Sequence, residues 1–232
     1  MSDDVRQMFA SIAPRYDLAN EVLSFGIHRF WRRATVSAAA LRKGAKVLDC
    51  ATGTGDLALA LKRAVGPKGV VVGTDFCAEM LSKSPQKAKD ARLDVRFEVA
   101  DVMSLPYEDG AYDAATIAFG IRNVDDPRRG ISEMARVTRP GGRVVVLEFG
   151  QPKGLFGALY RLYSRWIMPW MGGLLTRNRS AYTYLPKTAS QFPAGERFIE
   201  LMRSTGCFSE VSAIPLTFGL AYVYVGIVTA RR

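Results

Sequence analysis

Residues 47–58 read Val-Leu-Asp-Cys-Ala-Thr-Gly-Thr-Gly-Asp-Leu-Ala, an apolar strand end followed by a turn with two glycines and an apolar helix start. Gly53 and Gly55 lack a Cβ, so the backbone can turn sharply there and come close to a ligand. Open α/β sheets bind their ligands at the carboxyl ends of their strands. The stretch therefore predicts a cofactor site at the end of a buried strand.

The charge around this turn indicates which cofactor it holds. The two glycines and Ala58 satisfy the G-x-G-x-x-A pattern of dinucleotide sites, and Asp75 follows about 20 residues later. However, Asp49 and Asp56 bracket the turn, and their carboxylates would repel a pyrophosphate. The same carboxylates attract the ammonium and sulfonium groups of S-adenosylmethionine. We therefore favour S-adenosylmethionine over NAD.

Two further acids follow β-rich runs in the same way as Asp49. Asp75 ends the run that begins at residue 70, where it could accept hydrogen bonds from ribose hydroxyls. Asp101 follows the strand-like residues 95–100, and we expect it near the adenine edge. Any one of these acids alone could be a helix cap or a turn residue. Three acids after three separate strands favour a shared binding site.

Composition bounds the class of protein. With 232 residues, of which 48% are hydrophobic, the chain is long enough for one α/β domain over residues 1–232. Cys50, Cys77 and Cys207 are odd in number and widely spaced, which predicts neither disulfides nor a metal motif and suits a reducing compartment. The N-terminus lacks a signal-peptide pattern, and no run approaches the about 18 apolar residues of a membrane span. We expect a cytoplasmic protein without a bound metal.

The formal charge of +10 predicts an anionic partner, either nucleic acid or a membrane surface. A helical pattern over residues 155–170 separates an apolar face from Arg161 and Arg165. Its apolar face consists of Leu155, Leu159, Leu162, Tyr163, Trp166 and Trp170. Such a face suits the surface of an anionic membrane or the mouth of an apolar pocket, although it could also be a buried core stripe. The tryptophans, followed by Arg177 and Arg179, favour a membrane or apolar-ligand role over a buried core stripe. No nucleic-acid-binding module is recognisable.

Hydrophobic patterning predicts seven strands, with helices between the first five. The predicted strands span 45–50, 70–74, 95–99, 112–118, 142–149, 209–215 and 222–230. Strand–helix alternation through residue 149 predicts parallel pairing, and the short connection near Phe218 predicts an antiparallel C-terminal hairpin. We read Pro140-Gly-Gly as a turn before the fifth strand. Residues 1–40, helical with a break at Pro14, and the insert 150–191 are expected to form lids over the site.

The fourth predicted strand ends at residues that could stabilise negative charge. Arg122 and Asn123 follow Gly120, where a cation and an amide could hold an oxyanion that develops on a substrate. The Asn/Asp-Pro-Pro-aromatic motif of nucleic-acid amino-methyltransferases is absent from this position. Alternatively, Arg122 could form a structural salt bridge with Asp125 or Asp126.

Several longer motifs resemble one family. They are Phe9-x-x-Ile-Ala-x-Arg-Tyr-Asp17, Ser24-Phe-Gly-Ile-His-Arg-x-Trp-Arg-Arg33, Phe119-Gly-Ile-Arg-Asn-Val124, Pro140-Gly-Gly-Arg-x-x-x-Leu-Glu-Phe149 and Ser180-x-Tyr-x-Tyr-Leu-Pro186. Together they are similar to the ubiquinone and menaquinone biosynthesis C-methyltransferase family, from about Phe9 to Gly226. Gln151-Pro-x-x-Leu-Phe-Gly157 and Ile167-Met-Pro169 resemble its demethylmenaquinone branch.

The resemblance implies a Rossmann-like class I S-adenosylmethionine-dependent methyltransferase fold. It also implies contacts to that cofactor from the glycine turn with Thr54, from the acids, from Val102 and, through backbone, from Ala118. One departure concerns Tyr224, which stands where such proteins commonly place a histidine. Any role of that histidine is therefore in doubt for this chain, and a catalytically inactive membrane scaffold stays open as an alternative.

The resemblance further implies that the substrate is a reduced polyprenyl quinone precursor, methylated at a ring carbon. We assign Arg122 and Asn123 as the catalytic residues that hold the developing phenolate or its proton-accepting water. Tyr16, Tyr182, Tyr184 and the lone histidine His28 are candidate pocket residues from the lids. The branch motifs favour demethylmenaquinol as substrate and menaquinol as product. The alternatives are a 2-methoxy-6-polyprenyl-benzoquinol of ubiquinone biosynthesis and another apolar small molecule. A homodimer is left open, and an RNA-binding role is disfavoured.

Overall fold

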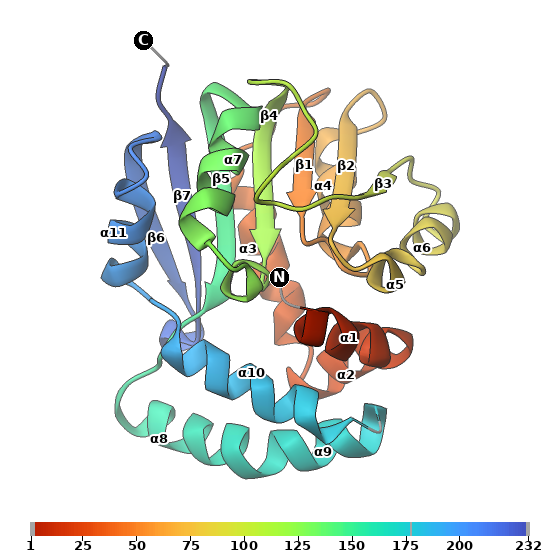
Figure 1. Ribbon diagram of the computed structural model, residues 1–232, viewed down its shortest axis with the longest axis vertical. Coiled ribbons are helices and arrows are strands. Elements are labelled where there is room, and N and C mark those ends of the chain that lie inside the picture. The colour runs from red at the N-terminus through yellow and green to blue at the C-terminus, as the bar shows by residue number, and fades with distance from the viewer. Residues whose placement is uncertain (1–2, 177, 231–232) are drawn as a thin grey trace.

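The computed structural model describes residues 3–176 and 178–230, and its centre is a seven-stranded sheet (Figure 1). The strand order is β3-β2-β1-β4-β5-β7-β6. The first five strands pair in parallel, and β7 lies antiparallel between β5 and β6. All seven predicted strands and the antiparallel C-terminal hairpin are confirmed. The strands are β1 (Lys46–Cys50), β2 (Val70–Asp75), β3 (Arg96–Val99), β4 (Tyr112–Ala118), β5 (Thr138–Phe149), β6 (Phe208–Leu216) and β7 (Ala221–Val228).

The fifth strand begins earlier than expected. We read Pro140-Gly-Gly as a turn before the strand, but β5 already pairs with β4 at Thr138 and its register shifts before Arg143. Gly141 has a φ of +72°, and a Cβ on Gly142 would lie 2.6 Å from the carbonyl oxygen of Asp113. A bulge therefore accommodates these residues inside the strand, as is usual for proline and glycine in sheets.

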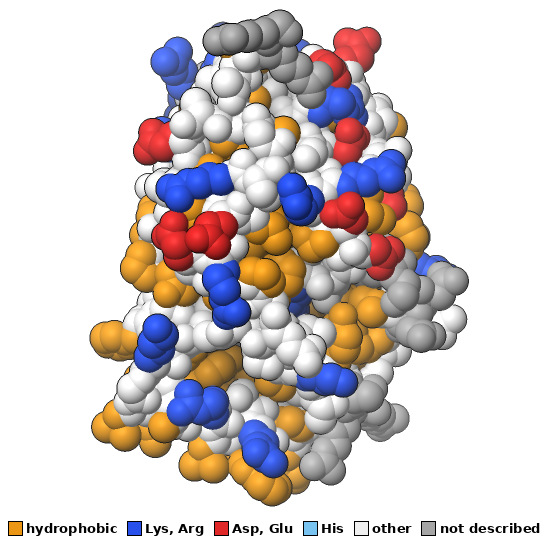
Figure 2. Space-filling view, turned by 60° about the vertical axis from the view of Figure 1, so that its left-hand side comes forward, with side chains coloured by type: hydrophobic (Ala, Val, Ile, Leu, Met, Phe, Trp, Pro, Cys, Tyr) orange, Lys and Arg blue, Asp and Glu red, His pale blue; other side chains and the backbone are white. Residues whose placement is uncertain are grey.

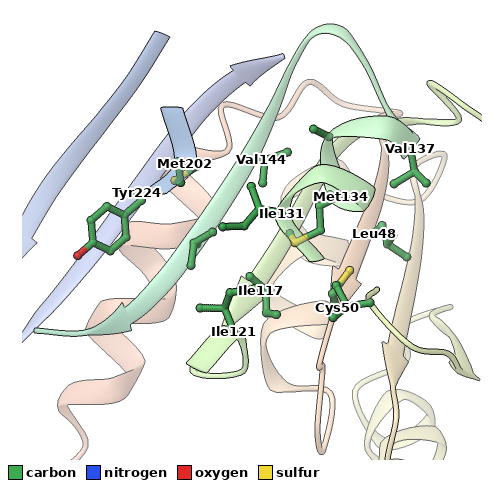
Figure 3. Close-up of a cluster of buried hydrophobic side chains, with 14 of the residues drawn as sticks. Leu48, Cys50, Ile117, Ile121, Ile131, Met134, Val137, Val144, Met202 and Tyr224 are labelled. Carbon is green, nitrogen blue, oxygen red and sulfur yellow. The ribbon is translucent and has the colours of Figure 1, made fainter. Parts of the chain in front are cut away.

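Two helical layers cover the sheet. The layer helices are α3 (Ile27–Ala38), α4 (Asp56–Val65), α5 (Ala78–Leu81), α6 (Ser84–Asp90), α7 (Pro127–Val137) and α11 (Glu196–Arg203). Successive residues of β1 point to opposite faces, so Val47 packs with α4 while Leu48 packs with α7. Helices α7 and α11 lie on one face, and α3 and α4 lie on the other (Figure 1). Figure 3 shows the core on the α7 face, where Tyr224 from β7 lies among buried aliphatic side chains.

The remaining helices gather at the end of the sheet where the parallel strands terminate (Figure 1). They are α1 (Asp3–Ile12), η1 (Ala13–Arg15), α2 (Tyr16–Leu23), η2 (Ile121–Asn123), α8 (Gly154–Leu162), the π-helix η3 (Tyr163–Ile167), α9 (Met168–Thr176), α10 (Arg179–Gln191) and η4 (Thr217–Gly219). The helical break at Pro14 is confirmed. Ile12 and Leu23 pack with Met168 and Tyr182, so the N-terminal segment and the insert contact each other. Within the N-terminal segment, helix α3 packs on the sheet, whereas α1 and α2 lie over the strand ends (Figure 1).

The periodic segment 155–170 is helical, but its apolar face is not a core stripe. Leu155, Leu159, Leu162, Trp166 and Trp170 are all exposed, whereas Tyr163 is half-buried and donates to the carbonyl oxygen of Leu23. The turn widens into a π-helix just before Pro169, which has no N–H to continue an α-helix. The interpretation of this face as core is therefore wrong. Arg177 and the side chain of Arg179 lie outside the described residues.

Candidate active site

The stretch 47–58 forms the end of β1, a tight turn and the start of α4. Gly53 and Gly55 have φ angles of +57° and +84°, in the left-handed region that favours glycine. A Cβ on Gly55 would also lie 3.0 Å from the ring of Phe97. The Gly53 N–H donates to Asp75 Oδ2 over 2.8 Å, which ties the turn to the end of β2. The two glycines thus keep bare backbone at the edge where a ligand would approach.

Asp49 lies beneath this turn with 1% of its surface exposed. Thr52 Oγ1 and Thr116 Oγ1 each donate to its carboxylate over 2.6 Å. Burial outweighs these hydrogen bonds and raises the pKa of Asp49 to about 6. Asp49 lines a cavity of about 800 Å³, so a cation bound there would favour its ionised form. The structure therefore places this acid where the predicted attraction for an ammonium group can act.

A second, smaller cavity of about 80 Å³ adjoins the other face of the turn. The predicted site residues that line it are Gly53, Asp75, Asp101, Val102, Ala118, Asn123 and Tyr16. Asp75 accepts from the N–H groups of Gly53 and Cys77, and burial raises its pKa despite these bonds. Asp101 accepts from the N–H of Met103. Both carboxylates thus stabilise turns, as the alternative reading holds, and both also face the cavity.

Thr54 is engaged by the N-terminal helices. Its hydroxyl donates to Asp17 Oδ1 of α2 over 2.5 Å. Lys87 Nζ of α6 contacts Asp17 Oδ2 at 2.9 Å and Asp56 Oδ1 at 2.5 Å, and Arg32 Nη1 of α3 contacts Asp56 Oδ2 at 2.6 Å. Desolvation opposes these charges, but Arg32 and Lys87 prevail and hold the pKa of Asp56 below its usual value. The network fastens α2 to the glycine turn.

The large cavity has an aromatic wall opposite the turn. It is formed by Trp31, Phe119, Phe149, Phe156 and Tyr160. The rings of Phe119 and Phe149 are 4.4 Å apart, and Trp31 packs against both. Trp31 Nε1 donates to Thr217 Oγ1 over 2.9 Å, which satisfies its polar edge. The tilted rings give the cavity an apolar aromatic lining against which a ligand ring can pack.

Arg122 lies on this wall and forms a buried ion pair. Its Nη1 is 2.9 Å from Glu148 Oε1 of β5 and donates to the carbonyl oxygen of Phe119 over 2.5 Å. Only 3% of the Arg122 side chain and 1% of the Glu148 side chain are exposed. The alternative expectation of a salt bridge between Arg122 and an acid is met, with Glu148 as the acid. The N–H of Phe149 donates to the same Glu148 oxygen, which fixes the carboxylate.

Tyrosines from both lids approach Arg122. Tyr16 of α2 lines both cavities, while Tyr182 and Tyr184 of α10 line the large one. Tyr184 donates to Asn123 Oδ1 over 3.2 Å, so the two predicted residues meet. Burial raises the pKa of Tyr16, Tyr160 and Tyr184, and the charge of Arg122 opposes this increase in each. These phenols therefore stay protonated near neutral pH and can act as hydrogen-bond donors.

Tyr224 lies away from this chemistry. It faces the α7 side of the sheet, is 1% exposed and lines neither cavity. Its hydroxyl accepts the N–H of Gly195, the residue before α11. Tyr224, which stands where we expected a histidine, thus helps to attach α11 and does not line the cavity.

His28 lines the large cavity at the start of α3. Its Nδ1 is 2.5 Å from Ser24 Oγ, and its Nε2 is 3.5 Å from Glu21 Oε2. Burial and the charge of Arg32 lower the pKa of His28. The ring is therefore largely neutral at pH 7 and joins the turn after α2 to α3.

Sequence reasoning missed Glu148, the ion-pair partner of Arg122, and several residues that line the large cavity. Glu148 belongs to a motif used for the family resemblance, and an acid inside an apolar strand was the signal that could have revealed it. Phe156 and Tyr160 were absent from the predicted apolar face because they point inward from α8. Trp31 also belongs to a quoted motif, but its contact with Thr217 spans 186 positions of sequence.

The sheet order, the glycine turn and the acids at the carboxyl ends of β1, β2 and β3 are typical of class I S-adenosylmethionine-dependent methyltransferases. The model of the ubiE/COQ5 methyltransferase family matches residues 1–228. The chain belongs to this family, so the expected family and S-adenosylmethionine-dependent class are confirmed. S-adenosylmethionine is accordingly its expected methyl donor.

Two curated relatives cover almost the whole chain. The ubiquinone/menaquinone biosynthesis C-methyltransferase UbiE of Bdellovibrio bacteriovorus is 52% identical and covers 97% of this chain and 95% of its own. The demethylmenaquinone methyltransferase of Deinococcus radiodurans is 50% identical, with 96% and 91% covered.

Solved structures of low identity share the fold. A SAM-dependent methyltransferase from Thermotoga maritima has a TM-score of 0.65 at 20% identity, covering 95% of this chain and 98% of its own. The [4+2]-cyclase SpnF has a TM-score of 0.62 at 20% identity, with 97% and 96% covered. Because this fold also serves a cyclase, the fold alone does not define the reaction.

Proposed function

We propose that this enzyme transfers a methyl group from S-adenosylmethionine to a ring carbon of a reduced polyprenyl quinone, with demethylmenaquinol as substrate and menaquinol as product. One observation carries the proposal: a single cavity of about 800 Å³ joins the glycine turn and Asp49 to Arg122 and the aromatic wall. The names of relatives at 50% identity support the substrate class.

The chain's residues fit the methyl donor in two parts. Asp49 supplies negative charge in the large cavity for the donor's ammonium end, beside the bare backbone of Gly53. Asp75, Asp101 and Val102 line the smaller cavity, which suits the ribose and adenine. When bound, S-adenosylmethionine supplies an electrophilic methyl group. Thr54 would contribute through its backbone because its hydroxyl already donates to Asp17.

The protein must hold the quinol ring and stabilise the negative charge that develops on its oxygen. Phe119 and Phe149 provide the stacking surface, and the guanidinium of Arg122 lies 5.3 Å from the centre of the Phe149 ring. A guanidinium is too basic to serve as a general base near neutral pH, so the role of Arg122 is to stabilise the phenolate. Asn123 and Tyr184 form a hydrogen-bonded pair beside it.

The proposed methyl transfer releases one proton to water. The phenolic proton passes to water while the ring carbon forms its bond to the methyl group and the sulfur–methyl bond breaks. The proton on that ring carbon then returns to the oxygen, which restores the aromatic quinol. Helices α1, α2 and α10 cover the cavity and limit the access of water, while Tyr16, Tyr182 and Tyr184 contact the substrate from this cover.

The buried ion pair supports a catalytic role for Arg122. Arg122 Nε and Glu148 Oε2 have no hydrogen-bond partner among the described residues. An incompletely satisfied buried pair adds little to stability compared with apolar side chains. Because Arg122 lies on the cavity wall, we infer that the ion pair serves the reaction rather than the stability of the fold.

We also propose that the enzyme acts as a peripheral protein on the inner face of the membrane, where a polyprenyl substrate resides. No helix in the described ranges 3–176 and 178–230 is long and apolar enough to cross a bilayer. The exposed apolar face of residues 155–170 supports surface binding instead.

A benzoquinol of ubiquinone biosynthesis is the second candidate substrate, because the relative at 52% identity carries both pathways in its name. The test supplies labelled S-adenosylmethionine with reduced short-chain demethylmenaquinone or with the matching benzoquinol. Product from demethylmenaquinol supports the first proposal, and product from the benzoquinol alone selects the second. Product from neither, with cofactor binding confirmed by calorimetry, contradicts both and leaves another apolar small molecule.

A further inference from the structure

Two phenylalanines occupy positions that folding does not favour. Phe25, in the turn between α2 and α3, is 79% exposed, and Phe218 of η4, between β6 and β7, is 84% exposed. Their φ angles are +49° and +55°, a region that bulky side chains rarely adopt. Neither burial nor backbone preference accounts for a large aromatic ring there. Strained residues of this kind point to a function.

Both rings flank helix α8. The Phe218 ring is 5.3 Å from that of Phe156, and the Phe25 ring is 6.0 Å from that of Tyr163. Phe156 and Tyr163 are seven positions apart, so they lie about two helical turns from each other on one face. Both line the large cavity, and so does Phe25. The two exposed phenylalanines therefore mark opposite ends of the cavity mouth beside α8.

The outer surface of α8 and α9 continues this apolar mouth. Leu159 is exposed and also lines the cavity, so apolar surface runs without a break from the outside to the inside. The other exposed apolar residues of α8, η3 and α9 are Leu155, Leu162, Trp166, Ile167, Trp170 and Leu174. Together with Phe25, Leu159 and Phe218 we call them the lipid-facing surface. Figure 2 shows hydrophobic side chains that project at this end of the molecule.

The charge around the lipid-facing surface has one sign. Residues 150–191 contain six basic residues and no Asp or Glu. On the face shown in Figure 2, basic side chains surround the projecting hydrophobic ones, and the acidic side chains lie toward the other end. A second copy of the chain would bring the same positive charges against this surface. An anionic bilayer instead complements both the apolar residues and the charge.

We propose that the lipid-facing surface inserts into an anionic bilayer and that the cavity mouth between Phe25 and Phe218 opens directly into the lipid. The quinol ring then moves laterally into the cavity while its polyprenyl tail stays in the membrane. Phe218 and the α8–α9 face anchor the protein, and Phe25 and Leu159 contact the first part of the tail. This inference rests on the proposed quinol substrate for its second half, whereas bilayer binding stands without it.

Flotation with lipid vesicles tests the surface. Wild-type protein should float with phosphatidylcholine vesicles that contain phosphatidylglycerol, and high salt should weaken this binding. The variant F218N/W166S should bind roughly tenfold or more weakly, since it removes two aromatic rings. Asparagine tolerates a positive φ, so the hairpin should stay folded. V70S, which changes an exposed valine at the other end of the sheet, is the control. Equal binding by F218N/W166S and V70S would overturn the surface assignment.

Charge reversal provides a matched pair of variants. R165E and R63E change the net charge equally, but only Arg165 lies beside the lipid-facing surface, next to Trp166. R165E should weaken binding to anionic vesicles and R63E should not. Equal effects would show that only net charge matters. Light scattering without lipid adds a further check, because a wild-type dimer abolished by F218N/W166S would assign the surface to a second copy of the chain.

Steady-state kinetics test whether the cavity mouth opens into the lipid. With a long-tailed quinol in vesicles, F218N/W166S should raise KM about tenfold. With a short-chain quinol dissolved in buffer, kcat and KM should stay within twofold of wild type. Equal loss with both substrates would contradict a lipid-facing mouth. If wild-type protein methylates neither quinol, the proposed function fails, while the flotation result still decides the surface.

Discussion

Removal of Arg122 should lower both stability and turnover, and a second substitution can separate the two effects. Arg122→Met leaves the Glu148 carboxylate, which is 1% exposed, without its cation. Breaking a buried pair in this way costs about 3–5 kcal/mol. For a chain of 232 residues this corresponds to a decrease in Tm of about 6–20 °C. Loss of a donor to the developing oxyanion should also lower kcat by about 10²–10³-fold.

The double variant Arg122→Met/Glu148→Leu replaces both charges with apolar side chains of similar size. It should recover most of the lost stability, since buried ion pairs can be replaced by apolar groups at little cost. Two hydrogen bonds would remain lost, one to the N–H of Phe149 and one to the carbonyl oxygen of Phe119, at about 1 kcal/mol each. Turnover should stay as low as in Arg122→Met, because the guanidinium is still missing.

Thermal unfolding by circular dichroism, methyl transfer and calorimetric titration with S-adenosylmethionine measure the three quantities. We expect the cofactor affinity of both variants to stay near that of wild type. Recovery of turnover in the double variant would refute the catalytic role of Arg122. Equal loss of turnover and cofactor binding would refute its assignment to the substrate side of the cavity.

Three further predictions concern other parts of the structure. Because burial raises the folded pKa of Asp49 to about 6 from 3.8, ionised Asp49 destabilises the fold, and its cost grows as pH rises between these values. Asp49→Asn should therefore increase the unfolding free energy at pH 8 by up to about 3 kcal/mol, which raises Tm. The same variant should bind the cofactor more weakly in calorimetry. An unchanged Tm would contradict the destabilising effect of ionised Asp49. Gly55→Ala should cost about 1–3 kcal/mol in chemical denaturation because of its φ of +84° and the nearby Phe97 ring, and an effect below about 0.5 kcal/mol would contradict the close packing. Tyr224→Phe leaves the N–H of Gly195 without its acceptor, so it should cost about 1–2 kcal/mol while kcat changes less than about twofold, and a large loss of kcat would place Tyr224 in the mechanism.

The sheet could be predicted from sequence because its signals are local. Apolar, β-rich runs that end in an acid or are followed by one identified β1, β2 and β3, and the short connection near Phe218 identified the C-terminal hairpin. The error at β5 was also local. Pro140 and its two glycines usually end a strand, and only the pairing of Thr138 with Tyr112 shows that they form a bulge inside it.

The site could be predicted only where its residues follow strand ends. The structure brings Asp49, Arg122 and Asn123 to the same edge because parallel strands end there. The partner of Arg122 is Glu148, 26 positions away, and the partner of Thr54 is Asp17, 37 positions away. No spacing rule links such pairs, because they form only when separate elements pack. The exposure of the apolar face at residues 155–170 likewise depends on which side of α8 meets the cavity.

The central claim is that this cavity methylates the ring carbon of a reduced quinone. It is tested most directly by single-turnover transfer of labelled methyl from S-adenosylmethionine to short-chain demethylmenaquinone, supplied either reduced or oxidised. We expect ring-methylated product from the reduced form only, because the reaction needs a phenolic oxygen whose developing charge Arg122 can hold. Product from the oxidised quinone at the same rate, or no product from the reduced form despite bound cofactor, would contradict it.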